Sequence, residues 1–151
     1  MNILSKKNIC LTSKATTQKE MFTDIAKLAV SNGYATDISL IEKGLVKRES
    51  EGTTGMMDGI AIPHCQSENI TSPGVFIFKS HHPIESQAMY EKPVHFIVSL
   101  LIPKDEAGKK KKKILSTIAR MLMKEDVKNE LLNASDEVTI LSILETNLKG
   151  V

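Results

Sequence analysis

The residues best suited to chemistry lie between Arg48 and Cys65, in the stretch RESEGTTGMMDGIAIPHC. The imidazole of His64 has an unperturbed pKa of about 6.5, so at neutral pH one ring nitrogen keeps a lone pair that can attack phosphorus. Residues 52–55 (GTTG) would supply backbone N–H groups and hydroxyls for phosphoryl oxygens, and Arg48 a planar two-pronged cation. This pattern is compatible with phosphoryl chemistry at His64, whereas Pro63 and His64 taken alone favour a purely structural histidine.

The elements around this stretch are predicted from its pattern of apolar residues. Residues 59–62 form a short apolar run that Pro63 ends, so we expect a strand there with His64 just beyond its terminus. Ligand chemistry collects at strand ends in open α/β sheets. Residues 74–79 (GVFIFK) and 94–102 (VHFIVSLLI) predict two further strands. The second is apolar on both faces and belongs at the centre of a sheet with helices above and below.

Helical patterns flank these strands on both sides. Thr17 begins a capping box before one helix, which Gly33 would end, and Asp37 can cap a second helix. Helical spacing of apolar residues returns from about Lys110 and again after Ser135, a plausible cap. Helices, then strands, then helices predict one layered domain of the α/β or α+β class.

Composition excludes several function classes. The 151 residues carry 20 basic and 18 acidic side chains, a formal charge of +2, which lacks the basic footprint of a nucleic-acid binder. The longest apolar stretch, residues 96–102, is too short for a membrane span. The N-terminus has no apolar signal-peptide core, and Cys10 and Cys65 form no Cys-x-x-Cys pair. We therefore expect a cytoplasmic protein with reduced thiols.

Several segments resemble one known family. Arg48-Glu49, then TTG (53–55) and GIAIPHC (59–65), resemble the active-site signature of enzyme IIA of the bacterial phosphoenolpyruvate-dependent sugar phosphotransferase system, fructose/mannitol type. KPVHFIVSLLIP (92–103) is similar to the family's central strand, and ILSTIARML (114–122) to the helix that follows it. The resemblance spans nearly the whole chain, from about residue 15 to residue 148.

The resemblance implies a fold and a reaction. The fold would be a single α/β domain over residues 1–151, with a mixed, mostly parallel sheet flanked by helices on both faces. His64 would accept a phosphoryl group from the carrier HPr and pass it to a cysteine of enzyme IIB, without cofactor or metal. Arg48, Thr54 and Gly55 would support the phosphate, and contact with the membrane would be indirect, through the enzyme IIC permease.

Two departures from the family pattern bear on this reading. Met57 stands where the family usually has Gly or Ala, and Lys111 stands about where many members have a second active-site histidine. The default interpretation of the lysine run 109–113 is a solvated helix start, and the alternative is that Lys111 neutralises phosphate as a point charge. Galactitol-type members are similar in having IPHC without the second histidine. A regulatory domain of the same fold, controlled by phosphorylation, and an interaction domain that has lost the relay are the alternatives.

The remaining reactive side chains are given structural roles. We expect His81 and His82 on an exposed loop, and His95 beneath a helix, with support of His64 as its alternative role. Cys65 is interpreted as a small packed residue. No spacing gathers ligands for zinc, so no metal site is predicted. Arg48 and Glu49 would by default form a surface pair at the end of a helix.

Overall fold

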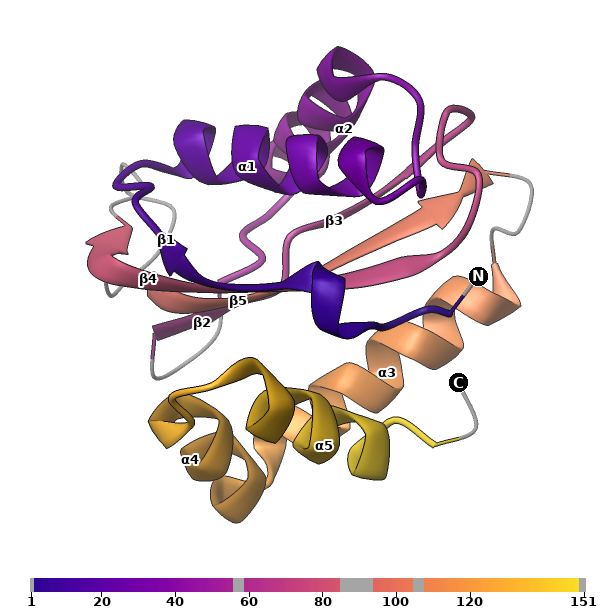
Figure 1. Cartoon of the computed structure of the whole chain (residues 1–151). Coiled ribbons are helices and arrows are strands. Elements are labelled where there is room, and N and C mark those ends of the chain that lie inside the picture. The colour runs from indigo at the N-terminus through magenta and orange to yellow at the C-terminus, as the bar shows by residue number, and fades with distance from the viewer. Residues whose placement is uncertain (1, 56–58, 85–93, 105–107, 150–151) are drawn as a thin grey trace.

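The computed structural model of the chain describes residues 2–55, 59–84, 94–104 and 108–149. None of the helices in these ranges is long and apolar enough to cross a membrane. Figure 1 shows the arrangement of the elements, with the strands in the middle of the molecule. In chain order they are η1 (Lys6–Asn8), β1 (Ile9–Ser13), α1 (Gln18–Ser31), α2 (Ile38–Ser50), β2 (Ile60–Ala61), β3 (His64–Ser67), β4 (Gly74–Ile84), β5 (Val94–Pro103), α3 (Lys109–Met123), α4 (Glu125–Asn133) and α5 (Glu137–Asn147).

The strands form one mixed sheet in the order β1-β4-β5-β2, with β3 also paired to β5. β1 runs parallel to β4, and both β2 and β3 run parallel to β5. Only β4 and β5, among the described strand pairs, are antiparallel. The predicted mixed, mostly parallel sheet is therefore confirmed.

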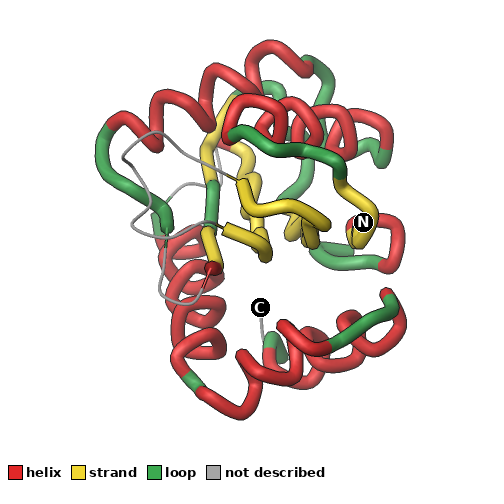
Figure 2. The backbone as a smooth tube through the Cα atoms, turned by 90° about the vertical axis from the view of Figure 1, so that its left-hand side faces the viewer, coloured by secondary structure: helices red, strands yellow, loops and turns green. Residues whose placement is uncertain are grey.

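Helices cover both faces of this sheet. α1 and α2 lie on one face, and α3, α4 and α5 lie on the other (Figures 1 and 2). In β5, Phe96, Val98 and Leu100 belong to the core that contains α3–α5, whereas Ile97 and Leu101 belong to the core of α1 and α2. A strand that is apolar on both faces is stable only between two covering layers. The alternation within β5 thus accounts for the α/β architecture, which is confirmed.

The helix starts follow the predicted caps with one exception. Thr17 and Asp37 each accept a hydrogen bond from the backbone N–H three residues later, at 3.1 and 3.0 Å. Ser135 was expected to cap the last helix, but Asp136 does so, accepting from the backbone at 2.7 Å. A carboxylate in this position bonds the free N–H group and also complements the positive end of the helix dipole.

The strand before His64 differs from the prediction. β2 is short, and Pro63 interrupts the strand instead of ending it, because β3 resumes at His64. The register against β5 continues unchanged, with Ala61 opposite Ile97 and His64 opposite Leu100. Pro63 has no N–H to donate, but its carbonyl still accepts bonds from the Leu100 N–H at 3.0 Å and the Ser99 hydroxyl at 2.9 Å. His64 therefore opens a strand held in the sheet.

Candidate functional site

The imidazole of His64 is held in one tautomer by its own strand. Its Nδ1 lies 2.8 Å from the carbonyl oxygen of Ile62. A carbonyl only accepts hydrogen bonds, so Nδ1 carries the proton and Nε2 keeps its lone pair. The residue is 9% exposed, which leaves a narrow opening to solvent. The arrangement presents one defined nucleophilic nitrogen.

Arg48 lies against that nitrogen. It occupies the last turn of α2, and its Nε donates to Nε2 of His64 at 3.2 Å. Its Nη1 donates to the carbonyl of Gly52 at 2.9 Å, which holds the guanidinium beside the loop that follows the helix. The structure thus brings together two predicted site residues that are 16 positions apart in the chain.

A close approach between α2 and β3 makes this contact possible. A Cβ added at Gly44 would lie 3.0 Å from Sγ and 3.3 Å from Cβ of Cys65, the residue after His64. Only a glycine lets the helix backbone come this near to the strand without displacing it. Arg48 follows Gly44 by four residues, so it lies on the same side of the helix, one turn further along. Gly44 therefore sets the distance between the Arg48 backbone and β3.

The environment keeps the His64 ring neutral. Burial is the largest cause that lowers its pKa below the ordinary value of 6.5, and the positive charges of Arg48 and Lys111 lower it further. The hydrogen bond to the Ile62 carbonyl and the charge of Glu49 act in the opposite direction. At neutral pH the ring is accordingly unprotonated at Nε2 and able to act as a nucleophile.

Lys111 approaches the site from the other helical layer. It lies in the first turn of α3 and is half-buried, whereas Lys112 and Lys113 are exposed. Its charge lowers the pKa of both His64 and Cys65, so it acts on the predicted site from the opposite side to α2. Two cations, from the two helical layers, therefore act on one imidazole at the edge of the sheet.

The predicted pocket residues Thr54 and Gly55 lie in the loop after α2, and Glu49 anchors this loop. Glu49 is only 2% exposed. Its Oε1 accepts from the Thr54 N–H at 2.9 Å, and its Oε2 accepts from the Thr54 hydroxyl at 2.5 Å. Gly55 donates its N–H to Thr53 Oγ1 at 3.0 Å and forms an antiparallel bridge with Ala61. The donors of Thr54 are thus engaged by the buried carboxylate.

The interpretation of Glu49 as half of a surface pair is wrong, because this side chain turns into the protein and not toward Arg48. A signal for its burial was present in the sequence. A glutamate in the last turn of a helix faces the negative end of the helix dipole, which is unfavourable without a specific partner. Thr54, five residues later, is that partner.

The other reactive side chains fall outside this site or are inert. Burial raises the pKa of the Cys65 thiol to about 12, in line with its interpretation as a packed residue. His95 is exposed, so its expected place beneath a helix is wrong. His81 and His82 continue strand β4 and do not form the expected loop. Met57 lies outside the described residues. Within the described ranges, no three His, Cys, Asp or Glu residues gather as metal ligands.

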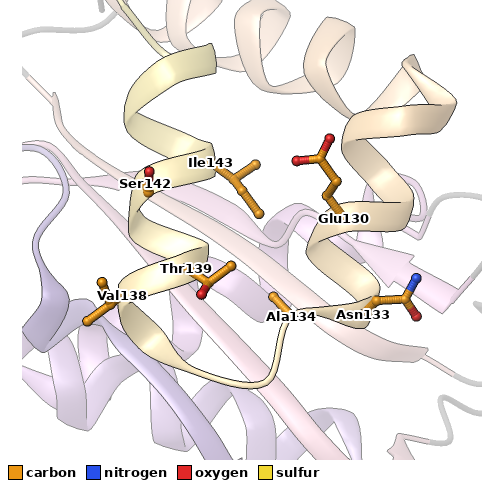
Figure 3. A pocket seen from close by; sticks show the side chains of 7 residues that line it. All are labelled: Glu130, Asn133, Ala134, Val138, Thr139, Ser142 and Ile143. Carbon is orange, nitrogen blue, oxygen red and sulfur yellow. The ribbon is translucent and has the colours of Figure 1, made fainter.

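A separate pocket lies between α4 and α5, on the sheet face opposite to α2 (Figures 1 and 3). Its volume is about 560 Å³. The lining has a single ionisable side chain, that of Glu130, and therefore lacks the groups needed for phosphoryl chemistry. The lining residues are Glu130, Asn133, Ala134, Val138, Thr139, Ser142 and Ile143.

Comparison with known proteins shows the family to which the chain is related. Residues 2–147 match the family described as phosphoenolpyruvate-dependent sugar phosphotransferase system, EIIA 2. The chain is 33% identical over 136 residues to the PTS system fructose-specific EIIA component of Haloferax volcanii, covering 90% of this chain and 88% of that protein. It is 32% identical over 127 residues to a nitrogen regulatory protein of Pseudomonas aeruginosa, covering 84% and 82%.

A solved structure shows the same fold. The nitrogen regulatory protein IIA-Ntr from Neisseria meningitidis superposes with a TM-score of 0.83 at 24% identity, over 94% of this chain and 96% of that one. With the family match over residues 2–147, the chain belongs to the EIIA 2 family of the phosphoenolpyruvate-dependent sugar phosphotransferase system, as a phosphoryl-carrier component.

Proposed function

We propose that residues 1–151 work as one carrier domain in which Nε2 of His64 holds the phosphoryl group. The observation that carries this proposal is the state of the ring: Nδ1 donates to the Ile62 carbonyl, and Nε2 is unprotonated, with its lone pair accepting from the Arg48 guanidinium. HPr is the proposed donor, and a cysteine of enzyme IIB is the proposed acceptor.

The transfer requires two displacements at phosphorus. In the first, the lone pair of Nε2 forms a bond to phosphorus while the N–P bond of phospho-HPr breaks, and that electron pair stays on the donor imidazole. The His64 ring gains positive charge, which its Nδ1–H shares with the Ile62 carbonyl. In the second, a cysteine thiolate of enzyme IIB attacks phosphorus and the electron pair returns to Nε2. Positioning and charge neutralisation suffice for such a labile group.

Arg48 and Lys111 supply that neutralisation. In the structure, Nε of Arg48 occupies the lone pair that attacks phosphorus, so the guanidinium must turn from nitrogen to phosphoryl oxygens as the group arrives. Its bond to the Gly52 carbonyl keeps it within reach during this change. Lys111 adds a second positive charge from α3. Thr54 and Gly55 shape the loop beside the ring, and we place them in the phosphate support through the position of this loop, since the N–H and hydroxyl of Thr54 bond Glu49.

Incubation with phosphoenolpyruvate, enzyme I and HPr tests the assignment. We expect the wild-type protein to form an acid-labile, base-stable adduct, and His64→Gln to form none while its thermal unfolding stays close to that of the wild type. His95→Gln is the matched control, because His95 is exposed and outside the site. An adduct that persists in His64→Gln would refute His64 as the carrier.

A regulatory role is the second candidate, and one comparison favours it. The chain is nearly as similar to the Pseudomonas aeruginosa nitrogen regulatory protein as to the fructose component. In that role, phosphorylation of His64 would control a partner protein. Transfer from phosphorylated protein to purified fructose-, mannitol- and galactitol-type enzyme IIB separates the roles: transfer to one supports sugar uptake, and transfer to none supports regulation.

The cellular setting follows from the carrier role. We propose that the chain works in the cytoplasm and meets the membrane only through the enzyme IIC permease. The relatives reported above are fructose-specific and nitrogen regulatory proteins, so they give no support to a galactitol-like branch. We therefore place the fructose-type enzyme IIB first among the acceptors.

A further inference from the structure

The carboxylate of Glu49 is buried at a cost that its surroundings must offset. It is 2% exposed, and its two oxygens accept hydrogen bonds from the N–H and the hydroxyl of Thr54. Removing an ionised carboxylate from water costs several kcal/mol unless it is bonded on both oxygens. Both oxygens face donors here, as a carboxylate requires. Thr54 is therefore a specific hydrogen-bond partner that offsets the burial of this charge.

A continuous chain of hydrogen bonds leads from Glu49 to the His64 ring. Glu49 holds the N–H and hydroxyl of Thr54. The Thr54 carbonyl accepts from the Ile62 N–H at 2.9 Å. The Ile62 carbonyl in turn accepts from Nδ1 of His64 at 2.8 Å. Consecutive residues of α2 thus act on the two ring nitrogens: Arg48 touches Nε2 directly, and Glu49 reaches Nδ1 through two intermediates.

We propose that Glu49 is a positioning residue of the His64 site, which fixes the ring orientation through Thr54 and Ile62 and supplies negative charge behind the ring. This inference rests on the proposed carrier role of His64. It assigns Glu49 a function that differs from those of Arg48 and Lys111, because it holds the ring and the loop without touching the phosphoryl group.

The charge of Glu49 acts on the ring in the required direction. It raises the pKa of His64, in opposition to burial and to the charges of Arg48 from α2 and Lys111 from α3. During transfer the ring gains positive charge when Nε2 bonds phosphorus. A nearby negative charge favours that state, and the fixed Ile62 carbonyl orients it.

Two isosteric variants distinguish loss of the Glu49 charge from loss of a single hydrogen bond. Glu49→Gln keeps the shape, removes the charge and replaces one of the two acceptor oxygens by an NH2 donor. Thr54→Val keeps the buried carboxylate and the backbone bond to it, and removes only the hydroxyl bond. Glu51→Gln is the matched control, since Glu51 is exposed at the end of the same helix. Each is compared with the wild type by thermal unfolding, by NMR titration of the His64 ring, and by the rate of phosphoryl transfer from HPr.

We expect Glu49→Gln to lower the pKa of His64 and to slow transfer by about 10- to 100-fold, the effect of a displaced reacting group. Thr54→Val should slow transfer measurably, by up to about tenfold, because it loses one bond to Glu49. It should leave the His64 pKa near the wild-type value, because the charge remains. Glu51→Gln should match the wild type in both. If Glu49→Gln does not fold, Thr54→Val tests the same bond network.

The outcomes distinguish this inference from the carrier role. A His64 titration in folded Glu49→Gln that equals the wild type, or a Thr54→Val protein that transfers at the wild-type rate, would overturn the role of Glu49. The titration needs no phosphoryl donor. A wild-type protein that accepts no phosphoryl group would refute the carrier role, while the titration would still decide whether Glu49 acts on the ring.

Discussion

Replacing Gly44 by alanine is expected to damage the site with little effect on stability. The new Cβ would lie 3.0 Å from Sγ and 3.3 Å from Cβ of Cys65, so the contact between α2 and β3 must give by a few tenths of an ångström, and we expect α2 to take up this shift. The contact from Arg48 to His64 is already 3.2 Å long. Such a movement carries it to the limit of a hydrogen bond. We therefore expect the Arg48–His64 contact to be lost.

The stability change is small because two effects oppose each other. Overpacking a buried contact costs about 1–3 kcal/mol. Alanine in place of glycine inside a helix stabilises the helix by about 1 kcal/mol. The net loss is about 0–2 kcal/mol, which lowers the midpoint of thermal unfolding by no more than about 8 °C in a chain of this size. Phosphoryl transfer should fall about tenfold or more, because the guanidinium is misplaced.

The assay measures the rate of phosphorylation by phospho-HPr together with thermal unfolding. Cys65→Ala removes the sulfur that the new methyl group meets, so the double variant Gly44→Ala/Cys65→Ala should recover most of the lost rate. Cys65→Ala alone should transfer at nearly the wild-type rate, because the thiol has no part in the reaction. A Gly44→Ala protein with the wild-type rate, or a double variant as slow as the single one, would refute the reasoning.

Two further predictions concern stability. The pKa of His64 is lower in the folded protein than in the unfolded chain, so below about pH 6.5 the unfolded state binds more protons at this residue than the folded state does. The free energy of unfolding should therefore decrease as the pH is lowered through that range, and His64→Gln should reduce this dependence on pH. Equal slopes of unfolding free energy against pH for both proteins would contradict the lowered pKa of His64. On the other face, Lys79 donates to the carbonyls of Leu132 and Ala134 at 2.7 and 2.6 Å, at the end of α4. Lys79→Met should cost about 1–3 kcal/mol in urea unfolding and leave the phosphoryl transfer rate unchanged, and a slower transfer would show that α4 affects the site.

Local sequence patterns predicted the elements that depend on local physics. Thr17 and Asp37 cap their helices as expected, because a side-chain oxygen bonding the first turn needs only residues nearby in the chain. The apolar alternation of β5 likewise required two helical layers. The family motif indicated Arg48 and His64 together, and the structure places them in contact.

The features that sequence reasoning missed depend on the path that the backbone takes after each element. Pro63 was expected to end its strand because it lacks an N–H group. Its carbonyl is bonded by Ser99, 36 residues away, and the strand therefore continues. The burial of Glu49 depends on the path of the loop that brings Thr54 back to the helix end. A pattern of apolar residues indicates neither the bond between Ser99 and Pro63 nor the course of this loop.

The central claim is that Nε2 of His64 carries the phosphoryl group, and NMR of the phosphorylated protein tests it most directly. In protein labelled with ¹⁵N in its histidines, ring correlations and coupling to ³¹P identify the modified nitrogen. The bonding of Nδ1 to the Ile62 carbonyl predicts phosphorus on Nε2 of His64. Phosphorus on Nδ1 of His64, or on any other residue, would contradict the account.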